Sequence, residues 1–293
     1  VKSTINATIQ QEVNALLDRH SQVLKTNEIY NAAALVVSVE TGDVLAYAGN
    51  LPKAAAQHSP SVDIVQAARS SGSILKPFLY AAMLHDGMMT PETIYPDIPS
   101  HFGAYNPKNF DESYSGAVKA NKVISKSLNI PSVHMLQQYG ISKFADKLRK
   151  LGMTTLNNAA SHYGLTLILG GAETSLWDLG AMYAGMARNL KNNYRYDGWY
   201  DSDNFRPLNF IQAQSKGPLS NEKKEKLSQS TYLNASSIWH TFESMQELVR
   251  PNEEVFWKSF PSAHRVAWKT GTSFGFRDAW AVGCTPDYVV AVW

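Results

Sequence analysis

The stretch Lys269-Thr270-Gly271-Thr272-Ser273 decides how this 293-residue sequence is interpreted. A Lys-Thr-Gly triplet in a strand-like run is typical of acyl-transfer sites in which lysines, and not histidines, move the protons. Two further short motifs, Ser-x-x-Lys and Ser-x-Asn, are expected on its N-terminal side in that order. The sequence contains both, as Ser73-Ile74-Leu75-Lys76 and Ser127-Leu128-Asn129. The ordered set predicts a serine nucleophile served by lysines.

The residues around Ser73 distinguish this Ser-x-x-Lys from a chance match, of which about one is expected in a chain of this length. Apolar neighbours predict that Ser73 opens a largely buried helix: Ile74, Leu75, Phe78 and Leu79. Lys76 then shares the face of Ser73, with about 5–6 Å between their Cβ atoms. Because burial and the positive helix terminus both disfavour an ammonium, Lys76 is expected to accept the proton of Ser73.

Two other matches to known motifs compete with this interpretation. Ser202-Asp203-Asn204 also spells Ser-x-Asn, but it lies in a turn-rich loop, whereas Ser127 ends a predicted helix over about 117–127 that closes before Pro131. The segment 271–275 fits Gly-x-Ser-x-Gly, the nucleophile elbow of α/β-hydrolases. That class needs a histidine after the serine, and the last histidine here is His264. Neither alternative is preferred.

Strand-like runs lie at both ends of the chain and helical patterns lie between them. The predicted strands cover 33–39, 44–47, 265–270, 278–284 and 288–293, and the predicted helices begin near residues 5, 73 and 117 and after Gly170-Gly171, the last with Thr174 or Ser175 as its cap. The pattern predicts an α+β fold with one antiparallel sheet, built from both termini and covered by helices, plus a mainly helical lobe.

The composition of the chain limits the classes of protein to which it can belong. With 44% hydrophobic and 18% charged residues the chain can bury a core, and a net charge of +2 argues against a nucleic-acid-binding protein. The lone Cys284 permits no intrachain disulfide and is expected to be buried. No metal ligand set, organic cofactor, transmembrane run or leader is predicted. The chain lacks an initiating Met and ends after a strand-like run, so we expect a fragment of a larger protein.

Four segments together resemble the transpeptidase domains of class A penicillin-binding proteins, of the 1C type. They are Arg69 to Phe78, Ser127 to Val133, Tyr163 to Glu173 and Lys269 to Trp280. The resemblance runs from about residue 30 to the end, which suggests a single β-lactamase/transpeptidase-like domain preceded by an N-terminal lead-in over 1–30. It implies a protein that acts at the extracytoplasmic face of the bacterial cytoplasmic membrane, in the periplasm. The segments that would anchor this protein in the membrane are not part of this chain.

The resemblance also implies roles for the motif residues. Ser73 would be the nucleophile, Lys76 the base, and Ser127, assisted by Lys269, the proton relay to the leaving amine; the division of work between the two lysines stays open. Substrate binding would fall to Asn129, Thr270, Gly271 and Thr272, and Asn129 would bond either the substrate amide or Lys76. The expected partners are peptidoglycan stem peptides and β-lactams, with no nucleic acid, and the expected reaction is D,D-transpeptidation that cross-links peptidoglycan.

Two other functions use the same acylation. A serine β-lactamase would release the acyl group to water, and Glu173 could then serve as a deacylating glutamate, although its place at a predicted helix start favours a capping role. A β-lactam sensor or non-catalytic penicillin-binding scaffold would keep the acyl group as a signal. The lifetime of the acyl-enzyme and the presence of a cross-linked product separate the three.

Overall fold

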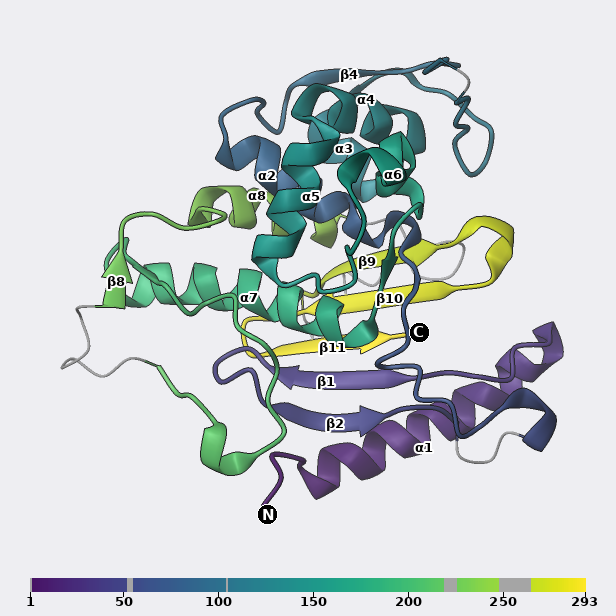
Figure 1. The fold of residues 1–293 in the computed structure, drawn as a ribbon, viewed down its shortest axis with the longest axis vertical. Helices are drawn as coiled ribbons and strands as arrows, with labels where there is room; N and C mark the ends of the chain where they lie inside the picture. The colour runs from purple at the N-terminus through teal and green to yellow at the C-terminus, as the bar shows by residue number, and fades with distance from the viewer. Residues whose placement is uncertain (1, 52–54, 104, 219–225, 248–264) are drawn as a thin grey trace.

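A five-stranded antiparallel sheet lies at the centre of the computed structural model, which describes residues 2–51, 55–103, 105–218, 226–247 and 265–293 (Figure 1). The strand order is β2-β1-β11-β10-β9, so the N-terminal hairpin pairs directly with the last strand of the chain. The strands are β1 (Ala34–Ser38), β2 (Val44–Ala48), β9 (Ala267–Thr272), β10 (Ala279–Cys284) and β11 (Tyr288–Val292). The prediction of one sheet built from both termini is confirmed.

Eight α-helices lie in the described part of the chain, and most of them form a lobe above the sheet (Figure 1). They are α1 (Ala7–Leu24), α2 (Lys76–His85), α3 (Ala120–Ser125), α4 (Asn129–Tyr139), α5 (Ile141–Leu151), α6 (Ala160–Tyr163), α7 (Leu176–Arg195) and α8 (Ala235–Gln246). Short two-residue or four-residue strands pair as β3 (Arg69–Ser70) with β6 (Glu173–Thr174), β4 (Ile94–Asp97) with β5 (Gly116–Lys119) and β7 (Tyr200–Asp201) with β8 (Leu227–Ser228).

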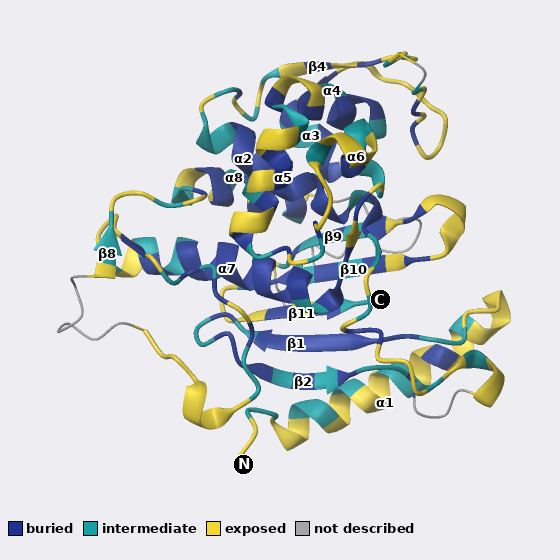
Figure 2. Ribbon diagram, viewed as in Figure 1, coloured by how far each residue is buried: buried dark blue, intermediate teal, exposed yellow. Residues whose placement is uncertain are grey.

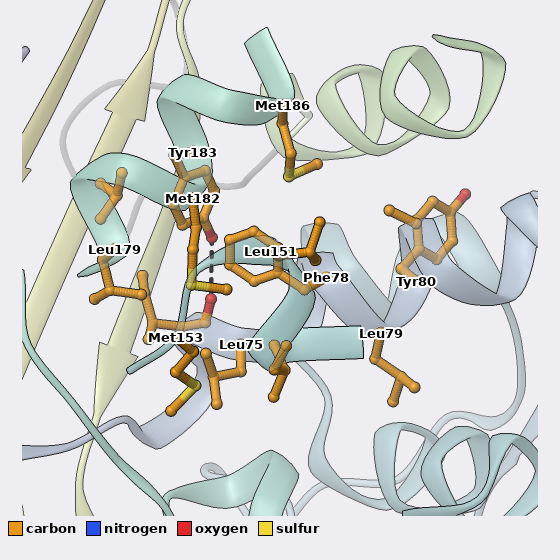
Figure 3. Packing of buried hydrophobic residues seen from close by; sticks show 14 of the residues in the cluster. Leu75, Phe78, Leu79, Tyr80, Leu151, Met153, Leu179, Met182, Tyr183 and Met186 are labelled. Atoms are coloured by element: carbon orange, nitrogen blue, oxygen red, sulfur yellow. Dashed lines mark hydrogen bonds between the residues drawn. The ribbon is translucent and has the colours of Figure 1, made fainter. Parts of the chain in front are cut away.

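Helix α7 joins the sheet to the helical lobe. It packs on β1, β10 and β11, and its Ser175 cap accepts a 3.0 Å bond from the Asp178 N–H, which settles the choice between Thr174 and Ser175. Its other side faces α2, where Phe78 and Tyr183 meet edge to face with ring centroids 4.8 Å apart (Figure 3). Tyr183 Oη also donates a 3.0 Å bond to the Ile74 carbonyl. The core therefore fixes the segment that follows Ser73.

The outer parts of the molecule are less buried than this core (Figure 2). Helix α1 lies along β2, tied to it by Asn6 N–H bonding Leu45 O at 2.9 Å, while Leu16 on the same helix keeps 55% of its surface exposed. Cys284 is buried as predicted, and burial raises the pKa of its thiol to about 12. Within the described residues, no helix has the length and apolar character to cross a bilayer.

Two boundary predictions in the helical lobe were wrong. Residues 116–119 form the strand β5 and not the start of a helix, because their backbone pairs with β4 in register Ile94 to Lys119. The predicted helix also does not end at Ser127, since α3 ends at Ser125 and the next helix, α4, begins at Asn129 and contains Pro131. A proline in the first turn is tolerated there, because the backbone donors of that turn have no intrahelical partners.

Candidate active site

Ser73 lies in a 3-10 turn, η3 (Gly72–Leu75), that leads straight into α2, so Lys76 begins the α-helix that was predicted to open at Ser73 itself. The backbone before this turn is held by the β3–β6 pair and by Trp280, whose Nε1–H donates a 2.8 Å bond to Ser70 O. Behind the turn, Tyr183 holds the Ile74 carbonyl. Fixed backbone on both sides gives the half-buried Ser73 a defined position.

Two glycines let the serine turn touch the Lys-Thr-Gly strand. Gly72 has a left-handed φ of +51°, and a Cβ there would lie 2.8 Å from Thr272 N and closer still to Thr272 O. A Cβ at Gly271 would lie 2.9 Å from Ser71 O and 3.0 Å from Ile74 N. Real Cβ atoms do not approach backbone so closely, which explains glycine at both positions. The contact brings the backbone of Thr272 against Gly72, the residue before Ser73.

Lys76 is almost fully buried, with 1% of its surface exposed, and its Nζ is surrounded by oxygen acceptors. It donates to Ser127 O at 2.8 Å, to Leu128 O at 3.0 Å and to Asn129 Oδ1 at 2.7 Å. Burial, followed by the nearby charge of Lys269, holds the pKa of Lys76 well below its usual range. The first and second motifs are therefore in direct contact.

Ser127 links the second motif to the third. Lys269 is fully buried, and its Nζ donates to Ser127 Oγ at 2.7 Å and to Thr270 O at 2.6 Å. Burial lowers the pKa of Lys269 to about 7. The backbone of Ser127 has a φ of +56°, which is uncommon for a residue with a side chain and is held here by bonds at its carbonyl, hydroxyl and N–H.

The structure thus brings Lys76, Ser127, Asn129 and Lys269 into one network, and it places Ser73 three residues before Lys76 at the same turn. Among the described residues Ser73 Oγ has no hydrogen-bond partner. Of the predicted substrate-binding residues, Gly271 is buried against the serine turn, Thr270 is half-buried and Thr272 is exposed. Of the two partners expected for Asn129, the structure shows Lys76, which donates to Asn129 Oδ1. The Nδ2 of Asn129 donates to Lys108 O at 2.8 Å.

Sequence reasoning missed a buried pair that holds the second motif. Asn109, with 3% of its surface exposed, accepts the Asn129 N–H at 2.9 Å through Oδ1. Its Nδ2 donates to Asp97 Oδ1 at 2.6 Å, and the other Asp97 oxygen accepts the Ser115 N–H at 2.9 Å. Asp97 is fully buried. A polar loop around Pro107 gives no periodic signal of such burial, so only the tertiary structure reveals the pair.

The competing motifs fall elsewhere. Asn204, from 202–204, is buried between Asn189 and Asn192 and makes structural amide bonds of 2.6 and 2.7 Å. Ser273 Oγ accepts the Asp278 N–H at 2.8 Å and so closes the β9–β10 turn. Glu173 does not cap α7: it is exposed on the short strand β6, and Ser175 is the cap.

The described part of the chain holds no group of three or more His, Cys, Asp or Glu side chains placed to bind a metal ion. The chemistry of the site is instead that of a hydroxyl, two buried amines, an amide and a strand edge. Lys76 and Lys269 both have lowered pKa values, that of Lys269 about 7, and a lysine with a lowered pKa can accept a proton as well as donate one. This combination suits nucleophilic acyl transfer.

A family model described as "Penicillin binding protein transpeptidase domain" matches residues 32–293. The chain belongs to this family of penicillin-binding transpeptidase domains. It is 29% identical to penicillin-binding protein 1C of Escherichia coli (strain K12) over 293 residues, which is 100% of this chain and 34% of that protein. It is 27% identical over 275 residues to penicillin-binding protein 1A of Neisseria meningitidis serogroup A, covering 90% of this chain and 32% of that one. The resemblance to class A members of the 1C type is confirmed.

Solved structures agree on the fold. The PonA1 protein of Mycobacterium tuberculosis in complex with penicillin V superposes with a TM-score of 0.74 at 19% identity, covering 100% of this chain and 76% of that one. A peptidoglycan glycosyltransferase from Burkholderia ambifaria gives a TM-score of 0.74 at 20% identity, with 99% and 89% covered. The predicted α+β transpeptidase-like fold is confirmed. The chain spans about a third of the length of the curated relatives named above.

Proposed function

We propose that this chain is a serine D,D-transpeptidase domain that takes the D-Ala-D-Ala end of peptidoglycan stem peptides as acyl donor and is acylated by β-lactams. The observation that carries the proposal is the network in which Lys76 bonds Asn129 and Lys269 bonds Ser127, directly beside the Ser73 turn. Membership in the penicillin-binding transpeptidase family supports the same reaction class.

In the first step Ser73 Oγ attacks the carbonyl carbon between the two D-alanines, and Lys76 takes its proton. The backbone N–H groups of Ser73 and Thr272 would bind the oxyanion, which is supported by the close approach of Gly72, the residue before Ser73, to the backbone of Thr272. Such donors typically lower a barrier by about 3–4 kcal/mol each. The C–N bond then breaks as Ser127 gives its hydroxyl proton to the leaving amine and takes a proton from the Lys269 ammonium bonded to its Oγ, and D-alanine departs from a Ser73 acyl ester.

The surroundings of Lys76 explain how it can act as the base. An ammonium has three N–H donors, which match its three oxygen acceptors, whereas the neutral amine has two donors and a lone pair. Its lowered pKa favours the neutral form, so one acceptor loses its donor and the lone pair becomes available to Ser73. Lys269, when protonated, keeps Lys76 neutral, because two adjacent ammonium groups repel each other.

In the second step the amine of a neighbouring stem peptide attacks the acyl ester, and Ser73 regains its proton. The terminal carboxylate of the donor suits Lys269, Thr270 and Thr272, which combine a cation with hydroxyl donors. We also propose that residues 1–293 form one transpeptidase domain of a longer, membrane-anchored protein, with 1–30 as its lead-in, and that it works at the extracytoplasmic face of the cytoplasmic membrane.

The proposal is tested by incubating the purified chain with a stem pentapeptide and an acceptor amine and by following products with mass spectrometry. A cross-linked product that disappears in Ser73→Ala is expected. A fluorescent penicillin gives the second readout. Rapid loss of its label would indicate a serine β-lactamase, and a stable label without any cross-linked product, whatever the acceptor, would indicate a sensor or scaffold. Either result contradicts the proposal.

A further inference from the structure

Trp293, which follows β11, contacts two segments that lead to the proposed oxyanion site. Its backbone pairs with that of Ala33 through bonds of 3.0 and 2.8 Å, so the residue is fixed to the sheet. The indole Nε1–H donates a 3.1 Å bond to Asp278 Oδ1. The guanidinium carbon of Arg69 lies over the same ring, 5.4 Å from its centroid, and Figure 1 shows the end of β11 beside the segment that leads up to α2. One side chain therefore touches both the β9–β10 turn and the segment before Ser73.

Asp278 holds the end of the strand that carries Thr272. Its carbonyl accepts the Ser273 N–H at 2.9 Å and its own N–H donates to Ser273 Oγ at 2.8 Å, which fixes the residue directly after Thr272. Because Asp278 is only 7% exposed, its carboxylate needs partners inside the protein, and the Trp293 N–H is one of them. A carboxylate at the N–H edge also polarises the indole and so strengthens the attraction of the ring face for a cation.

Arg69 supplies that cation from the strand β3, which leads into the serine turn. Its Nε is buried without a hydrogen-bond acceptor among the described residues, and the Trp293 ring faces the guanidinium instead. The next residue, Ser70, is held to the sheet by the Trp280 indole N–H. Since β3 pairs with β6 over two residues, backbone pairing alone gives this segment little support. The position of Ser73 relative to the sheet therefore depends on these side-chain contacts.

We propose that Arg69, Trp293 and Asp278 are positioning residues that keep the N–H groups of Ser73 and Thr272 aligned on one oxyanion. The inference rests on the proposed function, because it concerns the acylation of Ser73. Arg69 fixes the approach to Ser73, Asp278 fixes the end of β9 at Thr272, and the indole joins the two. Loss of this connection leaves the groups on β9 that bind the substrate carboxylate in place, but it slows the attack of Ser73.

The test follows acylation by a penicillin with intact mass over a series of ligand concentrations. This separates the first-order rate constant of acylation from the half-saturating concentration. Arg69→Gln and Trp293→Leu should each lower the rate constant roughly three- to tenfold, as expected for a lost cation–π contact, and keep the half-saturating concentration within about twofold of wild type. Arg69→Lys keeps a cation for the ring and should restore most of the rate. The double variant should be no slower than the slower single variant, because each substitution already breaks the same contact.

Lys143→Gln is the matched control. Lys143 Nζ lies over the Tyr139 ring in the helical lobe, 4.5 Å from its centroid, so this variant also removes a cation from an aromatic face. It should keep the wild-type rate constant of acylation, even where thermal unfolding shows that the chain has lost as much stability as in Arg69→Gln. Because Arg69 is only half-buried, its variants also keep the test available if Trp293→Leu does not fold.

Four results would each overturn this inference alone. They are a wild-type rate constant in Arg69→Gln, no recovery in Arg69→Lys, reductions that multiply in the double variant, and fewer acylated molecules with an unchanged rate constant. The last result would mean that the contact contributes to folding and not to the alignment of Ser73. Wild-type chain that the penicillin does not acylate would overturn the proposed function and this inference together.

Discussion

Lys269 Nζ donates a 2.7 Å hydrogen bond to Ser127 Oγ, although 142 positions separate the two residues in sequence. The bond joins the sheet to the helical lobe at the point where Lys76 is also held. Since burial lowers the pKa of Lys269 to about 7, the charge of this lysine changes near neutral pH.

The pH dependence of acylation should report both lysines. The rate constant with a carboxylate-bearing β-lactam is expected to fall as pH rises above about 7, because Lys269 loses the proton that attracts the carboxylate. At lower pH it should fall as Lys76, whose pKa is also lowered, becomes protonated. Lys269→Arg should be slower but lose the decline above pH 7, since a guanidinium stays charged. A wild-type rate constant that does not decline between pH 7 and 9 would contradict this assignment.

The stability of the chain should rise with pH through the same lysine. The pKa of Lys269 falls from 10.5 to about 7 on folding, so between these values the unfolded chain binds more protons than the folded one. The free energy of unfolding therefore increases by up to about 1.4 kcal/mol per pH unit in this window. The destabilisation caused by burying Lys269 is complete below about pH 7, where folding must keep the lysine charged, and it is absent above pH 10.5, where the lysine is neutral in both states. In urea titrations at several pH values, Lys269→Met should be more stable at pH 7 and show a smaller slope; an unchanged slope argues against a buried lysine.

Gly72→Ala should abolish acylation, because its new Cβ would collide with the backbone of Thr272. Gly87→Ala at the end of α2 is the matched control: its φ is also positive at +67°, but nothing lies within 4 Å of the added Cβ. Both variants bear the backbone cost of about 1 kcal/mol, and only the first disturbs the site. Equal acylation rates in the two variants would show that the Gly72 contact is unimportant.

Asn109→Ala should lower the acylation rate and destabilise the chain, because it leaves the buried Asp97 carboxylate and the Asn129 N–H without their partner. The loss in free energy of unfolding should be about 2–4 kcal/mol. Asn106→Ala, three residues earlier and exposed, should change neither property. If Asn109→Ala lost stability but kept the wild-type rate and pH profile, the pair would have no positioning role.

The fold and the motif residues could be predicted because their signals are local. Alternating strand runs, the apolar helix after Ser73 and the order of the three motifs are all visible in the sequence. The start of α4 was missed because Pro131 suggests a break, although its place in the first turn makes it tolerable. The Asp97–Asn109 pair and the left-handed Ser127 arise only from tertiary contacts, so no spacing rule could indicate them.

The most direct test of the account is the site of covalent modification. The chain is incubated with a penicillin, digested, and the modified peptide is sequenced by tandem mass spectrometry. We expect one adduct of the full mass of the ligand, placed on Ser73, formed slowly or not at all in Lys76→Met and absent in Ser73→Ala. An adduct on another residue, or one that persists in Ser73→Ala, would contradict the assignment of Ser73 as the nucleophile.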